Sequence, residues 1–204
     1  MNDQKIYPEL CVEGMKFGTV VELPEEYEVF DFSKGYDAQR TLKFPYGIGK
    51  YNEYRPSMYL GEQFLEDQRT VHMGIDVAAP VGTAVKAFYD GFIFALGNND
   101  LPWDYGPTII TEHRWLNQRI FALHGHLSKC SLDMWNVGDS IVKGSVVGRI
   151  GAKEENGGWN PHLHFQLSFM EPEGFDLPGV VSLKSRDWAQ RAFPDPRLVL
   201  GPLY

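Results

Sequence analysis

The stretch Pro161-His162-Leu163-His164-Phe165-Gln166-Leu167-Ser168-Phe169 decides the fold, because polar and apolar residues alternate along it. Successive side chains of a β-strand point to opposite faces, so one face of this segment is apolar and packs on a core. The other face carries two imidazoles, at His162 and His164. Neutral imidazole is the commonest metal-ligating side chain. The segment therefore indicates a strand that presents metal-binding or catalytic histidines, the alternative being two polar histidines without such a role.

Residues 69–170 predict a compact antiparallel β domain. Short apolar segments recur there between glycine, proline and asparagine residues, which is typical of strands joined by turns. They are residues 84–88, 92–96, 108–112, 120–123, 145–150 and 163–169. Residues 1–68 have poor periodicity and are expected to be an irregular extension that packs near a groove. Residues 171–204 are expected to be a C-terminal tail with one short helix over 185–193, which Pro194 ends.

Composition excludes several functional classes. The chain has 204 residues, of which 43% are hydrophobic, enough to bury a substantial core. Its formal net charge of −8 argues against a nucleic-acid partner. No apolar run approaches the ~20 residues of a membrane helix, so no membrane insertion is expected. The first residues show no signal peptide, so we expect a cytoplasmic protein, with export by another route left open. The sequence does not determine the oligomeric state.

Two further groups of residues complete a candidate metal site. His124 and His126 form a second His-x-His pair and share a face if their strand runs that far. His72 and Asp76 stand four residues apart and can lie on one side of a strand or helix. Two histidines and one carboxylate leave a fourth zinc position open, which is the pattern of a catalytic site. Other histidines are then available for acid–base work.

These motifs resemble the lysostaphin-type (LytM-like) zinc metallopeptidases, peptidase family M23. The family carries HxxxD, a later His followed by Leu-Ser, and a final HLHF, in this order. The matching segments cover about residues 69–170 and are His72-Met73-Gly74-Ile75-Asp76, Gly125-His126-Leu127-Ser128, Val137-Gly138-Asp139-Ser140-Ile141-Val142-Lys143-Gly144 and Pro161-His162-Leu163-His164-Phe165.

The resemblance implies a mostly antiparallel β fold with a groove over a Zn²⁺ ion held by His72, Asp76 and His164. It also implies that His126 and His162 are the catalytic histidines. Zinc polarises the substrate carbonyl, so one imidazole is expected to take a proton from the attacking water and another to stabilise the oxyanion. We expect His126 in the first role and His162 in the second, although the sequence leaves this division open, as it leaves open another divalent metal.

Three residues are expected to contact the substrate. His124 stands where the family commonly has Tyr and is expected to line the pocket beside His126. Trp159 lies in the loop before the HLHF motif, where it would alter the groove wall. Arg55 belongs to a polar and aromatic loop that is able to cover the groove and clamp a carboxylate or phosphate. For Arg55, the alternative is a surface loop held by its aromatic residues.

Three functions remain in competition. The first is a zinc metalloendopeptidase with a peptide substrate, peptidoglycan peptide being the default in this family. The second is a cytoplasmic zinc amidohydrolase or peptidase that acts on another substrate, which the missing export signal favours. The third is a non-catalytic adaptor that uses the same fold. Metal content separates the third from the others, and a substrate panel separates the first two.

Overall fold

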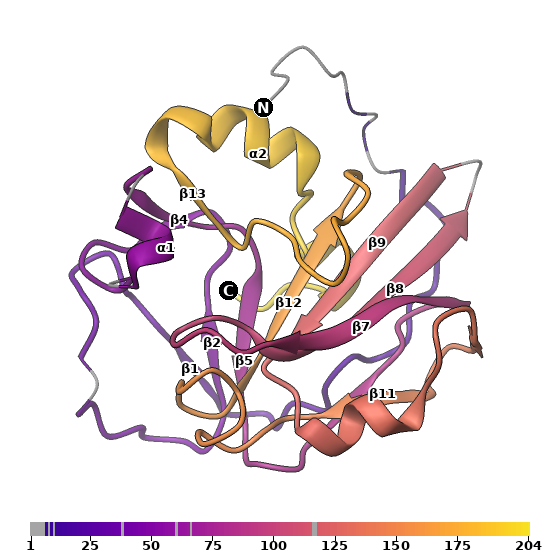
Figure 1. Cartoon of the computed structure of the whole chain (residues 1–204), viewed down its shortest axis with the longest axis horizontal. Coiled ribbons are helices and arrows are strands. Elements are labelled where there is room, and N and C mark those ends of the chain that lie inside the picture. Colours follow the sequence, from indigo (N-terminus) through magenta and orange to yellow (C-terminus); the bar gives the residue numbers. More distant parts are fainter. Residues whose placement is uncertain are drawn as a thin grey trace.

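Strand β12 (His162–Ser168) lies inside an eight-stranded sheet, between β5 (Ile75–Ala78) and β9 (Gln118–Gly125) (Figure 1). The computed structural model describes residues 7, 9, 11–37, 39–59, 61–65, 67–115 and 118–204. The order of the sheet is β1-β2-β5-β12-β9-β8-β7-β10. Its pairs are antiparallel except β1–β2. The expectation of a mostly antiparallel β fold is confirmed.

The large sheet contains further strands, and two smaller sheets and short helices complete the fold. The remaining strands of the large sheet are β1 (Glu28–Val29), β2 (Gly47–Gly49), β7 (Gly91–Asn99), β8 (Gly106–Trp115) and β10 (Ser140–Ile141). A two-stranded sheet joins β6 (Ala84–Lys86) to β11 (Val146–Arg149), and a three-stranded sheet has the order β13 (Val180–Ser182), β4 (Arg69–His72), β3 (Glu53–Tyr54). The helices are α1 (Glu62–Leu65), α2 (Arg186–Ala192), α3 (Arg197–Leu200) and the 3₁₀ helices η1 (Lys129–Met134) and η2 (Leu183–Ser185). Each of the six strands predicted within residues 69–170 overlaps an observed one.

Strand β12 separates two hydrophobic cores. Leu163, Phe165 and Leu167 enter the larger core, which the large sheet shares with β6 and β11. The smaller core lies on the other face and includes Val71 of β4 and Trp188 of α2. His164 and Gln166 belong to this second face, because strand residues alternate. The polar–apolar alternation of the sequence therefore places the histidines of β12 away from the larger core.

The segment before residue 69 takes part in the fold. Strand β2 pairs with β5, with Ile48 opposite Val77 and Gly49 opposite Asp76. Strand β3 pairs with β4, with Glu53 opposite His72. A segment expected to be irregular thus contributes three short strands, two of which lie beside residues of the candidate site. At the other end of the chain, α2 lies within the range expected to be helical (Figure 1).

His113 of β8 and His124 of β9 are completely buried in the large sheet. His113 is enclosed: its Nδ1–H donates to the carbonyl of Asp90 at 3.1 Å, so its Nε2 accepts from the hydroxyl of Thr111 at 2.7 Å. His124 donates from Nδ1 to the carbonyl of Ile109 at 3.1 Å, and its Nε2 has no hydrogen-bond partner among the described residues. Burial lowers the pKa of His113 to about 4 and that of His124 to about 3.

The expectation that His124 lines a pocket is wrong. Its side chain is 0% exposed and packs against Phe165, its cross-strand neighbour, on the face of the larger core. Strand β9 ends at Gly125, and His126 then adopts a φ of +62°. The change to a left-handed backbone breaks the period of two, so His124 and His126 do not share a face.

Among the described residues, no helix is long and apolar enough to cross a membrane.

Replacing Ile48 with Ala should show that the N-terminal segment is part of the cooperative fold. Ile48 is completely buried in the larger core, so we expect Ile48→Ala to lower the free energy of unfolding by about 2–5 kcal/mol. Val29→Ala, at an exposed site on β1, should change it by less than about 0.5 kcal/mol. Urea unfolding of both variants measures this, and equal shifts would contradict the packing of β2.

Acid should destabilise the fold through its buried histidines. Their folded-state pKa values lie below the ordinary value of about 6.5, so the unfolded chain binds protons that the folded chain resists. Stability therefore falls as the pH drops from about 6.5 towards 4. A His124→Leu variant should lose part of this dependence, which urea midpoints at several pH values will measure. An unchanged slope would show that His124 does not resist protonation in the folded protein.

Candidate metal and catalytic site

Three strands bring one ligand atom each to a single point. His72 ends β4, Asp76 lies on β5, and His164 is the cross-strand partner of Asp76 on β12. His72 Nε2 lies 3.1 Å and His164 Nδ1 lies 3.2 Å from Asp76 Oδ1, and the two nitrogens are 3.0 Å apart. All three residues are buried, and these ligand atoms lie within 4.8 Å of one another.

Hydrogen bonds on the far side of the two imidazoles decide which nitrogen of each ring carries the proton. His72 Nδ1 lies 3.0 Å from the carbonyl oxygen of Lys50, and His164 Nε2 lies 3.0 Å from Oε1 of Gln166. Both oxygens only accept, so these nitrogens carry the protons. The opposite nitrogens then point lone pairs at Asp76 Oδ1. Three such atoms repel one another unless a cation lies among them, and two neutral imidazoles with one carboxylate are donors that Zn²⁺ accepts.

Gly74 makes the close approach of His164 possible. A Cβ at this position would lie 2.5 Å from His164 Cε1 and 2.9 Å from the carbonyl oxygen of Phe165. Any side chain would therefore displace the imidazole or the backbone of β12. The glycine inside the His72–Asp76 motif is required by this contact between β12 and the turn that joins β4 to β5.

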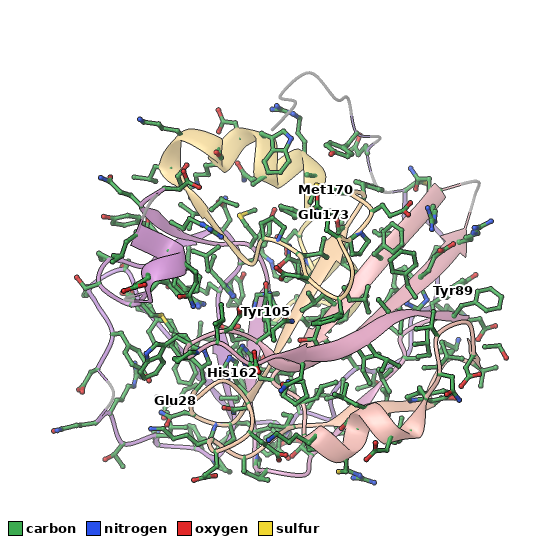
Figure 2. The ribbon with its side chains drawn as sticks, viewed as in Figure 1. Glu28, Tyr89, Tyr105, His162, Met170 and Glu173 are labelled. Carbon is green, nitrogen blue, oxygen red and sulfur yellow. The ribbon has the colours of Figure 1, made fainter. Side chains whose placement is uncertain are left out.

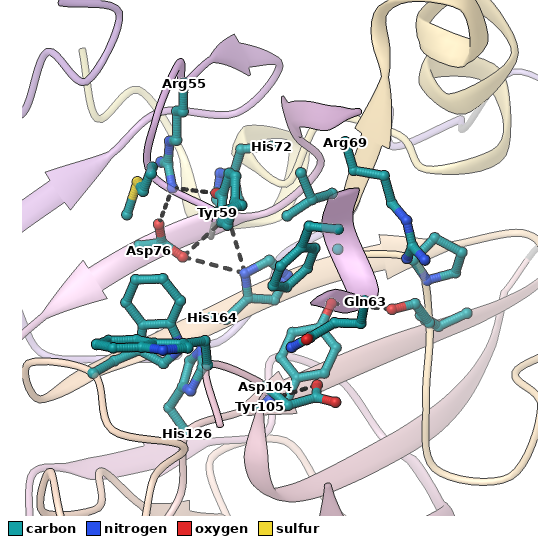
Figure 3. A pocket seen from close by; sticks show the side chains of 18 of the residues that line it. Arg55, Tyr59, Gln63, Arg69, His72, Asp76, Asp104, Tyr105, His126 and His164 are labelled. Carbon is teal, nitrogen blue, oxygen red and sulfur yellow. Dashed lines mark hydrogen bonds and ion pairs between the residues drawn. The ribbon is translucent and has the colours of Figure 1, made fainter. Parts of the chain in front are cut away.

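Arg55 holds the other oxygen of Asp76 (Figure 3). Its Nη1 donates to Asp76 Oδ2 at 2.7 Å and to the Tyr59 hydroxyl at 3.1 Å, while its Nε donates to Glu53 Oε2 at 2.9 Å. The side chain is 1% exposed. The expectation that Arg55 clamps a substrate group is wrong, because its guanidinium is committed to internal acceptors and orients Asp76.

Electrostatics keep this cluster in its metal-binding protonation state. Burial alone would raise the pKa of Asp76, but the Arg55 cation that donates to its second oxygen holds this pKa well below its ordinary value. Burial and the nearby Arg55 cation lower the pKa of His72 to about 4, against the opposing effect of Asp76. A carboxylate and a neutral imidazole therefore persist near neutral pH, the forms that ligate metal.

His126 and His162 stand beside the cluster with their rings 4.2 Å apart. His126 Nδ1–H donates to the Asn156 carbonyl at 2.8 Å, and His162 Nδ1–H donates to the Asn160 carbonyl at 2.6 Å. Each neutral ring therefore has Nε2 free to accept a proton, and His162 Nε2 lies 3.9 Å from Asp76 Oδ1. Burial is the main cause that lowers the pKa of both histidines, that of His126 strongly.

The backbone of His126 is held in an uncommon conformation. Its φ of +62° is rare for residues other than glycine, and such strain persists only where the surroundings impose it. The amide of His126 donates to the carbonyl of Tyr105 at 2.8 Å, and its carbonyl accepts from Gly151 at 2.9 Å. Two loops thus force the turn that points this imidazole away from the larger core and into the cleft.

These side chains line one cleft of about 300 Å³ (Figure 3). Trp159 forms part of its wall, as the sequence predicts, and contacts His126 at a ring separation of 6.4 Å. Tyr105 packs against His126 and His164, at ring separations of 5.7 and 5.1 Å. It lines the same cleft as His162, and both residues are labelled towards the middle of the view in Figure 2. The sequence did not predict the contact of Gln166 with His164 or the internal role of Arg55. Gln166 had a signal, because it shares the face of His162 and His164.

Comparison with known proteins agrees with this architecture. The family model "Peptidase family M23" matches residues 70–173, just over half of the chain. The DD-carboxypeptidase/endopeptidase Mpg of Neisseria meningitidis serogroup B and that of Neisseria gonorrhoeae are each 35% identical over 96 residues. This match covers 47% of this chain and only 20% of those proteins.

A solved structure shows the same fold. The catalytic domain of the antimicrobial peptidase lysostaphin from Staphylococcus simulans is 24% identical, with a TM-score of 0.50. The similarity covers 77% of this chain and 93% of that one. Because the family model spans the His72–Asp76 motif and all of β12, the chain belongs to peptidase family M23.

Proposed function

We propose that this chain is a zinc-dependent metalloendopeptidase in which His72, Asp76 and His164 hold the metal and His126 and His162 are catalytic. The single observation that carries the proposal is the convergence of three lone-pair-bearing ligand atoms within 4.8 Å, beside two further imidazoles in the same cleft. Family membership supports a peptidase. The retained ligand set argues against a non-catalytic adaptor.

A bound zinc ion would polarise the scissile carbonyl and acidify a water molecule. The chain's own residues supply the proton transfers. His126 holds its proton at Nδ1, on the carbonyl of Asn156, so its Nε2 is the acceptor for a proton from the attacking water. Burial favours the neutral form that can act as this base.

His162 has the same resting tautomer, with Nδ1–H on the Asn160 carbonyl. It donates from Nε2 only after it has taken up a proton. We infer that His162 acts second: it receives the proton that His126 took from the water, and as an imidazolium it stabilises the oxyanion and returns this proton to the leaving amine. Its partly exposed position, with 16% of the side chain accessible, leaves room for a substrate beside it.

Peptidoglycan peptide is the default substrate class that we propose. The family resemblance supports it, and the Neisseria relatives carry the name DD-carboxypeptidase/endopeptidase. A zinc amidohydrolase or peptidase with another substrate would use the same residues, so substrate trials must include peptides unrelated to peptidoglycan.

Replacing His126 with Ala should abolish turnover and leave the metal in place. His126 contributes no ligand atom to the three-residue cluster, and loss of a general base typically lowers the rate by about 10²–10⁴-fold. We would measure amine release from purified peptidoglycan, muropeptides and a synthetic peptide mixture, with zinc content determined on the same samples.

His72→Ala and a chelated sample are the matched controls for this experiment. Both should lose zinc together with activity, because each removes or empties the ligand cluster. Release that survives in His126→Ala or in the chelated sample would contradict the proposed mechanism. Amine release from the synthetic peptide mixture alone would show that the substrate is a peptide unrelated to peptidoglycan.

Arg55→Lys should weaken zinc binding. Lysine keeps the charge but cannot donate to Asp76, Tyr59 and Glu53 together, so Asp76 loses the contact that orients its second oxygen. Loss of a partner that orients a metal ligand typically costs about 10–100-fold in affinity. Competition with a chromophoric chelator measures the zinc affinity directly, without any substrate.

Arg114→Lys is the control for Arg55→Lys. Arg114 also pairs with a carboxylate, at 2.7 Å from Glu112, but its side chain is largely exposed and belongs to β8. Its zinc affinity should equal that of the parent protein. Equal affinities for Arg55→Lys and Arg114→Lys would show that Arg55 does not position Asp76.

A further inference from the structure

A second cavity continues the catalytic cleft. It encloses about 360 Å³ and shares Met58, Asp76, Trp159 and His162 with the cleft. We call it the apolar hollow and define it by Phe30, Phe32, Tyr36, Leu42, Pro80 and Trp159, which lie among its lining residues. Since two of the shared residues belong to the candidate site itself, a substrate that reaches the site also borders the hollow.

The cleft and the hollow follow one another along the same two strands. On β5 the cleft includes Asp76, and the hollow continues from Asp76 past the end of the strand to Pro80. On β12 the cleft includes His164, and the hollow continues from His162 back to Asn160. An extended peptide advances about 3.3 Å per residue. If the scissile bond of the substrate lies beside Asp76 and His162, the side chain of the next residue is therefore able to enter the hollow.

The wall of the hollow is built by aromatic rings in mutual contact. Phe30 and Phe32 lie 5.3 Å apart, Phe32 and Tyr36 lie 6.1 Å apart, and Tyr36 contacts Trp159 at 6.3 Å, measured between ring centroids. The guanidinium of Arg55 lies 4.8 Å from the ring centre of Phe32. The wall is thus tied to the catalytic cleft twice, through Arg55 at Phe32 and through Trp159 at Tyr36, so the hollow exists before a substrate binds.

We propose that the apolar hollow is the subsite for a large apolar side chain of the peptide substrate, directly beside the scissile bond. The proposal rests on the peptidase function proposed above and narrows its substrate class. A glycine would leave the aromatic wall unfilled. An acidic side chain would lose hydration and meet Asp37, because the guanidinium that lines the hollow, that of Arg40, is already paired with Glu28 at 2.7 Å. An aliphatic or aromatic side chain fills it and transfers its apolar surface from water.

Cleavage of a defined peptide mixture tests this subsite. The zinc-loaded full chain is incubated with synthetic peptides in which every residue type precedes and follows many bonds, and mass spectrometry identifies the cut sites. We expect Leu, Met, Phe or Tyr to be enriched at one position beside the cut. Matched fluorogenic peptides with Leu, Gly or Asp at that position should then differ in kcat/KM by about tenfold or more in favour of Leu.

Leu42→Asp is the variant that separates the subsite from the catalytic machinery. Leu42 is 41% exposed, so a carboxylate there charges the hollow without disturbing a core. We expect it to raise KM for the Leu peptide about tenfold and to change the Gly peptide by less than about twofold. Leu183→Asp, at a 54% exposed leucine that does not line the hollow, should change neither.

Binding distinguishes failure of the subsite from failure of the proposed function. Anisotropy of dye-labelled Leu and Gly peptides with the His126→Ala protein reports the preference without turnover. Cleavage without apolar enrichment, or a Leu42→Asp variant that weakens both peptides equally, overturns the subsite alone. A third outcome is that no peptide is cut, although the Leu peptide binds more tightly than the Gly peptide and Leu42→Asp removes this difference. The hollow then still binds apolar side chains, and only the peptidase proposal falls. Absence of both cleavage and preference overturns both.

Discussion

The candidate site depends on the contacts that the carboxylate of Asp76 makes. One oxygen lies 3.1–3.2 Å from His72 and His164, and the other accepts from Arg55 at 2.7 Å. A buried carboxylate without partners would take up a proton, since burial penalises its charge. Here the surrounding groups hold the pKa of Asp76 well below its ordinary value. One oxygen of Asp76 is thus available to bind a cation, while the other is held by the guanidinium of Arg55.

This arrangement gives the N-terminal segment a part in the site. Strands β2 and β3 pair with the strands that carry Asp76 and His72, and Arg55 follows β3 directly. The carbonyl of Lys50, between these two strands, accepts from the His72 imidazole. Further upstream, Phe30, Phe32 and Tyr36 form the wall of the apolar hollow. A segment outside the family match therefore orients two of the three candidate ligands and borders the place where a substrate would lie.

Local patterns predicted much of the fold and part of the site. The alternation from His162 to Ser168 indicated a strand with two different faces, and the structure has it as β12. The grouping of His72 with Asp76 and of His162 with His164 indicated a cluster, and the structure brings His72, Asp76 and His164 together. The same reasoning failed at His124, because a period of two holds only while the backbone stays extended, and it changes hand at His126.

By itself, the sequence determined which residues are candidates for the chemistry and that β12 has one apolar and one polar face, because residue type and strand period are local properties. Only the tertiary structure decided how those residues are held. Arg55 and Asp76 are 21 positions apart, and Gln166 and Lys50 fix imidazole tautomers through contacts that arise when β2, β4, β5 and β12 pair. The difference has a physical cause: a buried charge acquires its partners and its pKa from groups that meet only after long-range strand pairing.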